Sequence, residues 1–278
     1  MPLIAPLADI PQAHISGDKL MAGEEIVVTS AIAVGGYIGT KLFGTALATM
    51  GDDINKLYVK GRDKIVEIAS KKVDNPDDGK KVNIRAARDV LWNGAITEDE
   101  VCAEYFGGML AAARSEDGKD DGVVHYVDTI KAMSARQLEL HYVIYKAWQG
   151  LLNQSGKSIN VAKSADVQAW HIFMNGLELS QRRLPYDRDL TVLHRLGLLS
   201  QFEYNSHTIG DKTMPFLNVT PTTFGVMLFA VAHNKIETWR EFGNESYEST
   251  AGIQPLGYFA ENLEKLCNAS GMPFKAEA

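Results

Sequence analysis

Residues 187–232 read DRDLTVLHRLGLLSQFEYNSHTIGDKTMPFLNVTPTTFGVMLFAVA, and they carry the clearest topological signal in the chain. A short helical pattern at 187–197 ends on Gly197, and two extended candidates follow at 200–204 and 216–219. Polar residues at 205–213 separate these two strands. Thr220, with Pro221 at the favoured first helical position, begins an apolar helix through Ala232. This order of helix, strand, polar tip, strand and helix predicts a small winged-helix-like module.

The helix at 187–197 offers a candidate contact surface. Three leucines at helical spacing face inward, so that Arg188, Thr191 and Arg195 face outward, as they would on a recognition helix. Two further arginines lie just before the helix, and two cationic side chains fall on the polar tip. The candidates for binding nucleic acid or a partner are Arg182, Arg183, Arg188, Thr191, Arg195, His207 and Lys212. Residues 182–212 hold five basic and four acidic side chains, so a structural or protein-binding module is the alternative to nucleic-acid contact.

Upstream of this module the apolar residues repeat at helical spacing. The expected helices are 52–73, 83–96, 99–114, 123–132 and 135–150, and a further helix at 166–183 opens the module. Thr97 and Glu100 form a capping box before the third helix, and Ser134 caps the fifth. The expected fold is therefore mainly α. A helical bundle at 24–150 is followed by a winged-helix-like α+β module at 164–234 and by a helical extension at 235–278, with one amphipathic helix at 255–267.

The N-terminal part carries a loose arm and then an apolar segment. Prolines and glycines prevent a long helix over residues 1–23. Residues 26–50 contain one charge, Lys41, and a length that suits a bilayer, which needs ~20 residues. Gly35 and Gly39 have the spacing that lets helices approach closely. A helix of small residues that packs in a core or between subunits has the same sequence pattern. The candidates for membrane contact or for oligomer contact are therefore Gly35, Gly39, Lys41 and Phe43.

Composition excludes several protein classes. Two cysteines in 278 residues exclude a disulfide scaffold or a cysteine-rich zinc module. A net charge of −7 excludes a non-specific nucleic-acid coat protein. Residues 56–88 are basic and residues 97–121 are acidic. These are expected to be two solvated faces that partly neutralise each other, or else a docking surface for an anionic partner. No secretory signal is visible, so a cytoplasmic protein is expected.

No catalytic constellation emerges from the sequence. The seven histidines have no close metal-ligand spacing, and each is expected to be a satisfied structural residue. Walker A, dinucleotide-binding and nucleophile-elbow patterns are absent. Cys102 lies beside Glu100 and Glu104, and negative charge opposes formation of its thiolate. The expectation is a protein without catalytic residues, metal or cofactor.

Several segments between residues 37 and 233 follow one another in a recognisable order. They are the glycine-punctuated Gly39–Asp53, the basic helix through Lys64, the acidic helix Ile96–Arg114, the helix pair Val124–Tyr145 with Met133-Ser134 at its joint, and the closing pair Leu193–Leu199 and Val219–Phe229. In pattern and order these segments resemble the abortive-infection alpha family of bacterial proteins. The acidic helix reads Tyr105-Phe106-Gly107-Gly108-Met109-Leu110-Ala111-Ala112 where the family usually has a tryptophan and a Leu-Leu-Ala stretch. The resemblance implies a helical antiphage defence protein and supplies no catalytic residue.

The expected function is therefore a non-enzymatic antiphage (abortive infection) protein that senses or binds a phage or host component and arrests the cell. The charged loop at 115–122 is a candidate contact for that component. A membrane-disrupting effector that uses residues 26–50 is one alternative. A winged-helix regulator that binds DNA or RNA is another. The expected partners are a phage or host protein, nucleic acid, a membrane on activation, or further copies of the chain.

Overall fold

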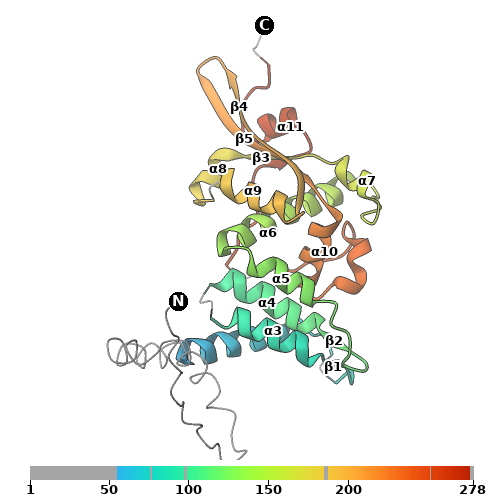
Figure 1. Cartoon of the computed structure of the whole chain (residues 1–278). Coiled ribbons are helices and arrows are strands. Elements are labelled where there is room, and N and C mark those ends of the chain that lie inside the picture. The colour runs from blue at the N-terminus through green and yellow to red at the C-terminus, as the bar shows by residue number, and fades with distance from the viewer. Residues whose placement is uncertain (1–54, 76, 97–98, 185–186, 251, 276–278) are drawn as a thin grey trace, which may run out of the picture. The chain divides into compact units, whose positions relative to one another are not determined.

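The structure, a computed structural model, describes residues 55–75, 77–96, 99–184, 187–250 and 252–275. They belong to one compact unit, Ile54–Ala278. The described residues are about 52% helical with a small antiparallel sheet (Figure 1), which confirms the expectation of a mainly helical chain with some sheet. The predicted arm at 1–23 and the apolar segment at 26–50 lie outside the described residues.

Helices occupy most of residues 55–155. A helix at 55–71 is followed by α3 (Ile84–Gly94), α4 (Glu100–Ala112), α5 (Val124–Lys131) and α6 (Ala135–Ser155). Two short strands, β1 (Lys81–Val82) and β2 (Arg114–Ser115), pair antiparallel beside the start of α3 and the end of α4. The predicted helices are confirmed with bounds that shift by a few residues. The largest shift is at the end of α6, which runs five residues further than predicted, to Ser155.

Polar side chains start α3, α4 and α6 by accepting hydrogen bonds from unpaired N–H groups of the first turn. Ser134 caps α6 as predicted, and Gln137 completes a capping box there. The predicted cap of α4 was wrong, because Asp99 and not Thr97 occupies that position. The Oδ1 atom of Asp99 accepts from the backbone N–H of Val101 at 2.9 Å. A carboxylate at this place also interacts favourably with the helix dipole.

The core is built around α6. Tyr142, Tyr145 and Trp148 of this helix are fully buried. The elements that pack against it are α4, α9 (Asp187–Arg195), α10 (Thr223–Ala232) and β3 (Ile172–Asn175). One continuous set of buried apolar side chains extends from Ile65 in the first helix to Leu256 near the C-terminus. The helical part and the following mixed part therefore share one core.

A buried ion pair joins the first helical layer to α10 (Thr223–Ala232). Lys72 Nζ lies 2.7 Å from Glu104 Oε2, and both side chains are mostly buried. The same ammonium donates to the backbone carbonyls of Glu104 and Ala232, each at 2.9 Å. All three of its protons are used, as a buried charge requires. Burial nevertheless lowers the pKa of Lys72, against the effect of Glu104.

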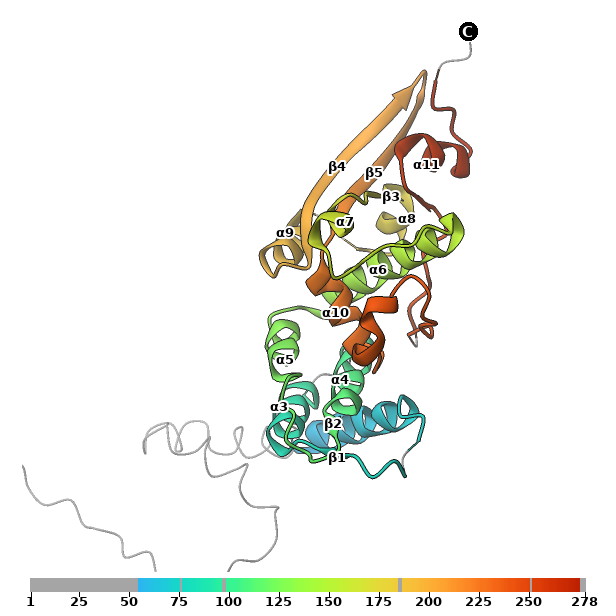
Figure 2. The same cartoon turned by 90° about the vertical axis from the view of Figure 1, so that its right-hand side faces the viewer.

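The second half of the described chain forms a sheet between short helices. The elements are α7 (Ser164–Gln168), β3 (Ile172–Asn175), α8 (Gly176–Gln181), α9 (Asp187–Arg195), β4 (Leu199–Ile209) and β5 (Lys212–Pro221). With β6 (Phe259–Ala260) from the C-terminal part, the sheet order is β4-β5-β3-β6, and every pair is antiparallel. Figure 2 shows α9 at the base of the long β4–β5 hairpin, beside α6.

Three local predictions in this half were wrong. The helix expected at 166–183 is interrupted by β3, since Ile172 and Met174 pair with β5 and bury their side chains completely. The polar residues 205–213 mostly continue the two strands, which leave only a two-residue turn at 210–211. Strand pairing overrides their polar composition. Thr222, not Thr220, caps α10, and Pro221 ends β5.

The C-terminal residues complete the sheet and cover the hairpin. A 3₁₀ helix, η1 (Ile236–Glu241), is followed by β6 (Phe259–Ala260) and α11 (Leu263–Ala269). The helix predicted at 255–267 was therefore wrong in its first half, where β6 pairs with β3. A second small core forms where α11 meets the hairpin, with Met214, Phe216 and Leu266 at its centre.

Candidate binding surface on α9 and the β4–β5 hairpin

The buried side of α9 fixes this helix against α6. Leu190 and Leu193 are fully buried, and Asp189 is 2% exposed. The Asp189 carboxylate accepts from Arg136 Nε at 3.0 Å and from Gln137 Nε2 at 2.9 Å, both at the start of α6. A buried carboxylate held by two such donors resists rotation of the helix, because any turn would leave the charge unpaired. No local sequence signal points to these two donors, because both lie more than 50 residues before Asp189 in the chain.

The outward side of α9 carries the predicted contact residues. Arg188, Thr191 and Arg195 are exposed, as the leucine spacing predicted. The His194 ring, also exposed, lies edge-on to Phe202 of β4, with ring centroids 5.9 Å apart. Three of the predicted residues therefore share one helix face next to the hairpin.

The other four predicted residues lie elsewhere. Arg182 is engaged within the fold, donating to Glu178 at 2.7 Å and to the carbonyl of Pro255 at 2.6 Å. Arg183 is exposed with a left-handed backbone, φ 57°. His207 stacks on Phe274 with ring centroids 5.3 Å apart, and Lys212 is exposed at the hairpin tip. Ten residues of strand place that tip ~30 Å beyond the base of β4. The hairpin residues are thus remote from the α9 face (Figure 1).

The predicted membrane or oligomer contacts, Gly35, Gly39, Lys41 and Phe43, lie outside the described residues. Among the residues that the structure describes, no helix combines the length and the apolar character needed to cross a bilayer.

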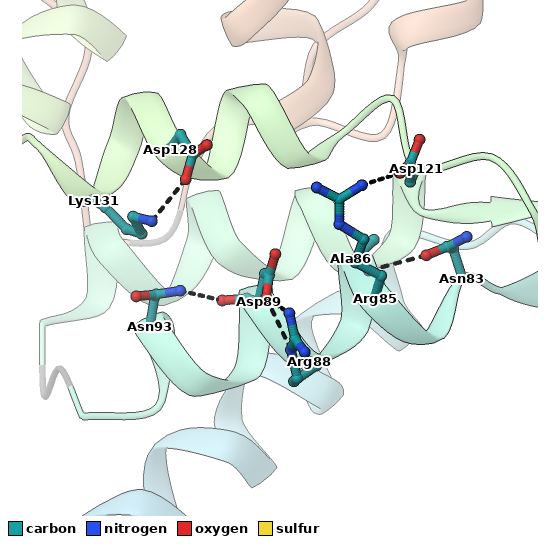
Figure 3. Close-up of polar contacts among 9 residues, drawn as sticks. All are labelled: Asn83, Arg85, Ala86, Arg88, Asp89, Asn93, Asp121, Asp128 and Lys131. Atoms are coloured by element: carbon teal, nitrogen blue, oxygen red, sulfur yellow. Dashed lines mark hydrogen bonds and ion pairs between the residues drawn. The ribbon is translucent and has the colours of Figure 1, made fainter.

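The basic and acidic stretches of the first half meet within the molecule. Lys64 pairs with Glu100 (3.4 Å), Lys72 with Glu104 (2.7 Å) and Arg85 with Asp121 (2.6 Å). A further pair, at 2.5 Å, joins Arg114 of the acidic stretch to Asp78 of the basic stretch. Figure 3 shows the Arg85–Asp121 contact between α3 and the charged loop that had been a candidate contact. These pairs favour the interpretation of two partly neutralised faces over that of a docking surface for an anionic partner.

The buried histidines have structural partners. His141 Nε2 lies 3.2 Å from the carbonyl oxygen of Gly225 and therefore carries a proton, and Nδ1 accepts from the Tyr105 hydroxyl at 2.6 Å. His233 Nδ1 donates to the carbonyl of Phe229 at 2.7 Å. Burial lowers the pKa of each imidazole to about 3. In the described part of the chain no group of three His, Cys, Asp or Glu side chains could hold a metal ion.

Four of the segments that carry the family resemblance, Ile96–Arg114, Val124–Tyr145, Leu193–Leu199 and Val219–Phe229, contribute residues to this buried network. Tyr145 of the helix pair donates its hydroxyl proton to the carbonyl of Leu198 at 2.5 Å and accepts from the N–H of Thr222 at 3.0 Å. Gly225 approaches Tyr145 so closely that a Cβ atom there would overlap the hydroxyl. These residues hold α6, α9 and α10 together, so they serve the packing of the fold. Comparison with protein-family models, with curated proteins and with solved structures found no match.

Proposed function

We propose that this chain is a bacterial antiphage protein of the abortive-infection type, which binds a phage or host component and performs no catalysis. The observation that carries the proposal is the exposed face of α9. Three hydrogen-bonding side chains stand on a helix whose other face is fixed by buried leucines and by Asp189. The resemblance to the abortive-infection alpha family supplies the biological setting.

We infer that the helices at 55–155 form a bundle and that α7 to β5 form a winged-helix module. The order helix, strand, helix, helix, strand, strand supports this inference, as does the pairing of β3 with the last strand, β5. In helix-turn-helix proteins the second helix of the pair presents its outer face to the binding partner. Here α9 has that place.

Phage plating tests the proposed function. Bacteria that express the chain should form fewer phage plaques than bacteria without it, and the culture should collapse only at a high phage dose. The triple variant Arg188→Ala, Thr191→Ala and Arg195→Ala should restore plaque numbers to the level without the protein. Arg240→Ala, at an exposed cation on η1, is the matched control and should leave protection unchanged. Unchanged plating over a broad phage panel would contradict the proposal.

A nucleic-acid-binding regulator is a second candidate, and the burial of Asp189 favours it. Residues 182–212, which include α9, contain five basic and four acidic side chains. Asp189 is buried and paired with Arg136, whereas Arg188 and Arg195 are exposed on the outer face of α9. Exposed arginines on one helix face can contact phosphate groups.

Fluorescence anisotropy with a labelled duplex should separate these two candidates. Arg188→Ala combined with Arg195→Ala should weaken binding by roughly tenfold at low salt and lower the salt-dependence slope by about two, one for each lost phosphate contact. Arg240→Ala is again the control. Absence of binding at low salt would contradict the regulator candidate. The component bound by the proposed antiphage protein would then be a protein.

A further inference from the structure

Two adjoining hollows lie where α6 ends. The first has a volume of about 380 Å³ and is lined by the last turn of α6, by the residues that follow it and by residues 243–244 after η1. The second has a volume of about 310 Å³, and residues 169–171 before β3 and 261–262 between β6 and α11 line it. Lys157 lines both hollows, so together they form one groove, to which four separate segments of the chain contribute.

The first hollow offers hydrogen-bonding groups that the fold does not use. The side chains of Asn153, Ser158 and Asn244 are exposed and make no hydrogen bond with any residue that the structure describes. Each amide presents two N–H donors and an accepting oxygen, and the hydroxyl both donates and accepts. A ligand in this hollow therefore meets donors and acceptors side by side, a combination that the hydroxyl groups of a ligand satisfy.

The second hollow has an aromatic wall. Trp170 is half-buried, and the Lys157 ammonium lies 5.4 Å from the centroid of its ring. The Lys157 side chain is 63% exposed, so this contact is weak and the ammonium can leave the ring at little cost. His171 Nδ1 lies 3.3 Å from the Thr220 hydroxyl, which leaves Nε2 for a ligand. The wall thus combines a flat apolar ring with polar groups at its edge.

The charges of the groove favour an uncharged ligand. Within the described ranges, the charged residues that line it are Lys157 and Glu261, which pair at 3.6 Å. Lys265 also contacts Glu261, at 2.5 Å. Because the carboxylate is already paired twice, it is a poor anion for an ammonium compound. A single paired ammonium is likewise a weak field for a phosphate group.

We propose that the groove binds a neutral oligosaccharide, with one pyranose ring packed on Trp170 and the next units bonded to the two amides of the first hollow. A pyranose ring has a flat face of C–H groups and a rim of hydroxyls, so it matches an aromatic wall with polar groups beside it. A nucleoside would also stack on Trp170. However, no described aromatic residue lines the first hollow, whose uncommitted amides suit a chain of hydroxyl-bearing units.

This site is separate from the outer face of α9. That helix is held by Arg136 and Gln137 at the start of α6. Gln137 and Asn153 are 16 residues apart on α6, which places the groove ~24 Å along the helix. The oligosaccharide proposal therefore goes beyond the proposed function, and neither depends on the other.

Isothermal titration calorimetry on the full chain tests the proposal. The probes are maltotriose and the trimer of N-acetylglucosamine, each titrated to about 20 mM. At least one should bind with a dissociation constant between about 0.1 and 5 mM. That constant should change less than about twofold between roughly 50 and 500 mM NaCl, because salt screens interactions between charges and the probe has none.

Variants locate the binding site. Trp170→Ala should raise the dissociation constant more than about tenfold, because it removes the wall on which the sugar ring packs. Trp92→Ala removes an exposed tryptophan of α3 outside the groove and should leave the constant unchanged. Circular dichroism checks the folding of each variant. The double variant Asn153→Ala and Asn244→Ala should weaken binding about tenfold, and it replaces Trp170→Ala where the latter unfolds.

Three results would overturn the proposal. The first is the absence of binding by both sugars over the whole range. The second is native affinity in both the Trp170 variant and the double amide variant, which would place the sugar elsewhere on the chain. The third is tighter binding of adenosine, or of inorganic phosphate at low salt, than of either sugar, which would assign the groove to a different class of ligand.

Discussion

Lowering the pH from 6.5 to 4.5 is expected to lower the free energy of unfolding by about 5 kcal/mol, because two buried imidazoles must stay neutral in the folded chain. His141 is enclosed between Tyr105 and the carbonyl of Gly225, and His233 lies between Phe229 and Tyr142. Burial is the main cause of the low pKa of both rings. Two lysines, Lys72 and Lys146, lower the pKa of His233 further.

The sign of the effect follows from where the proton binds more strongly. The folded pKa of each histidine is about 3 and the ordinary value is 6.5, so the unfolded chain takes up protons first as the pH falls. The stability that the neutral rings provide is complete above pH 6.5 and is lost between 6.5 and 3. Each ring contributes about 1.4 kcal/mol per pH unit in that window. Burial raises the pKa of Glu139, and this carboxyl acts weakly in the opposite direction.

Urea unfolding followed by tryptophan fluorescence at four pH values between 7.5 and 4.5 measures this dependence. His141→Gln and His233→Gln should each remove about half of the change between pH 6.5 and 4.5. Each variant is also expected to be less stable than the native chain at pH 7.5, because it alters core packing. His194→Gln, at an exposed ring on α9, is the control and should keep the full dependence. A free energy that stays constant from pH 6.5 to 4.5 would show that the rings are accessible to protons.

The helices of the first half could be predicted because their signals are local. A run of apolar residues at helical spacing and a cap such as Ser134 are readable in a short window of sequence. The strand β3 could not be read in this way. Ile172 and Met174 fit a helical pattern equally well, and only pairing with β5, more than 40 residues later in the chain, makes them a strand.

The candidate surface also has one property that the local sequence predicts and one that it does not. The outward face of α9 was predictable, since leucine spacing alone places Arg188 and Arg195 opposite the core. The absence of Asp189 from that face could not be predicted. Asp189 is buried against Arg136 of α6, a residue 53 positions earlier in the chain.

Gly108→Ala is expected to destabilise the chain by about 3 kcal/mol, since α4 and α10 meet there without room for a methyl group. A Cβ atom at Gly108 would lie 1.9 Å from the carbonyl oxygen of Ala232 and 2.3 Å from its carbon. Because the overlapping atoms belong to the backbone of Ala232, no side-chain rotation can relieve the overlap. The end of α10 must move instead.

That movement breaks a second contact. The same Ala232 carbonyl accepts from Lys72 Nζ at 2.9 Å, and Lys72 neutralises the mostly buried Glu104. Lys72→Met leaves that carboxylate unpaired and should itself cost about 3 kcal/mol. Because both substitutions disturb one carbonyl, the double variant should lose less than the two single losses combined. Thermal unfolding and urea unfolding of the four proteins give this coupling.

Gly243→Ala provides the matched control. A Cβ atom there would meet only Leu152, at 3.5 Å, which is ordinary contact, so its unfolding midpoint should remain close to that of the native chain. Full additivity of Gly108→Ala and Lys72→Met would mean that α10 stays in place and that the strain is absorbed within α4. A native midpoint for Gly108→Ala would mean that the helices are further apart in solution. Both the Lys72–Glu104 ion pair and the packing of α4 on α10 involve the Ala232 carbonyl. Either result would show that these two contributions to stability are not coupled through it.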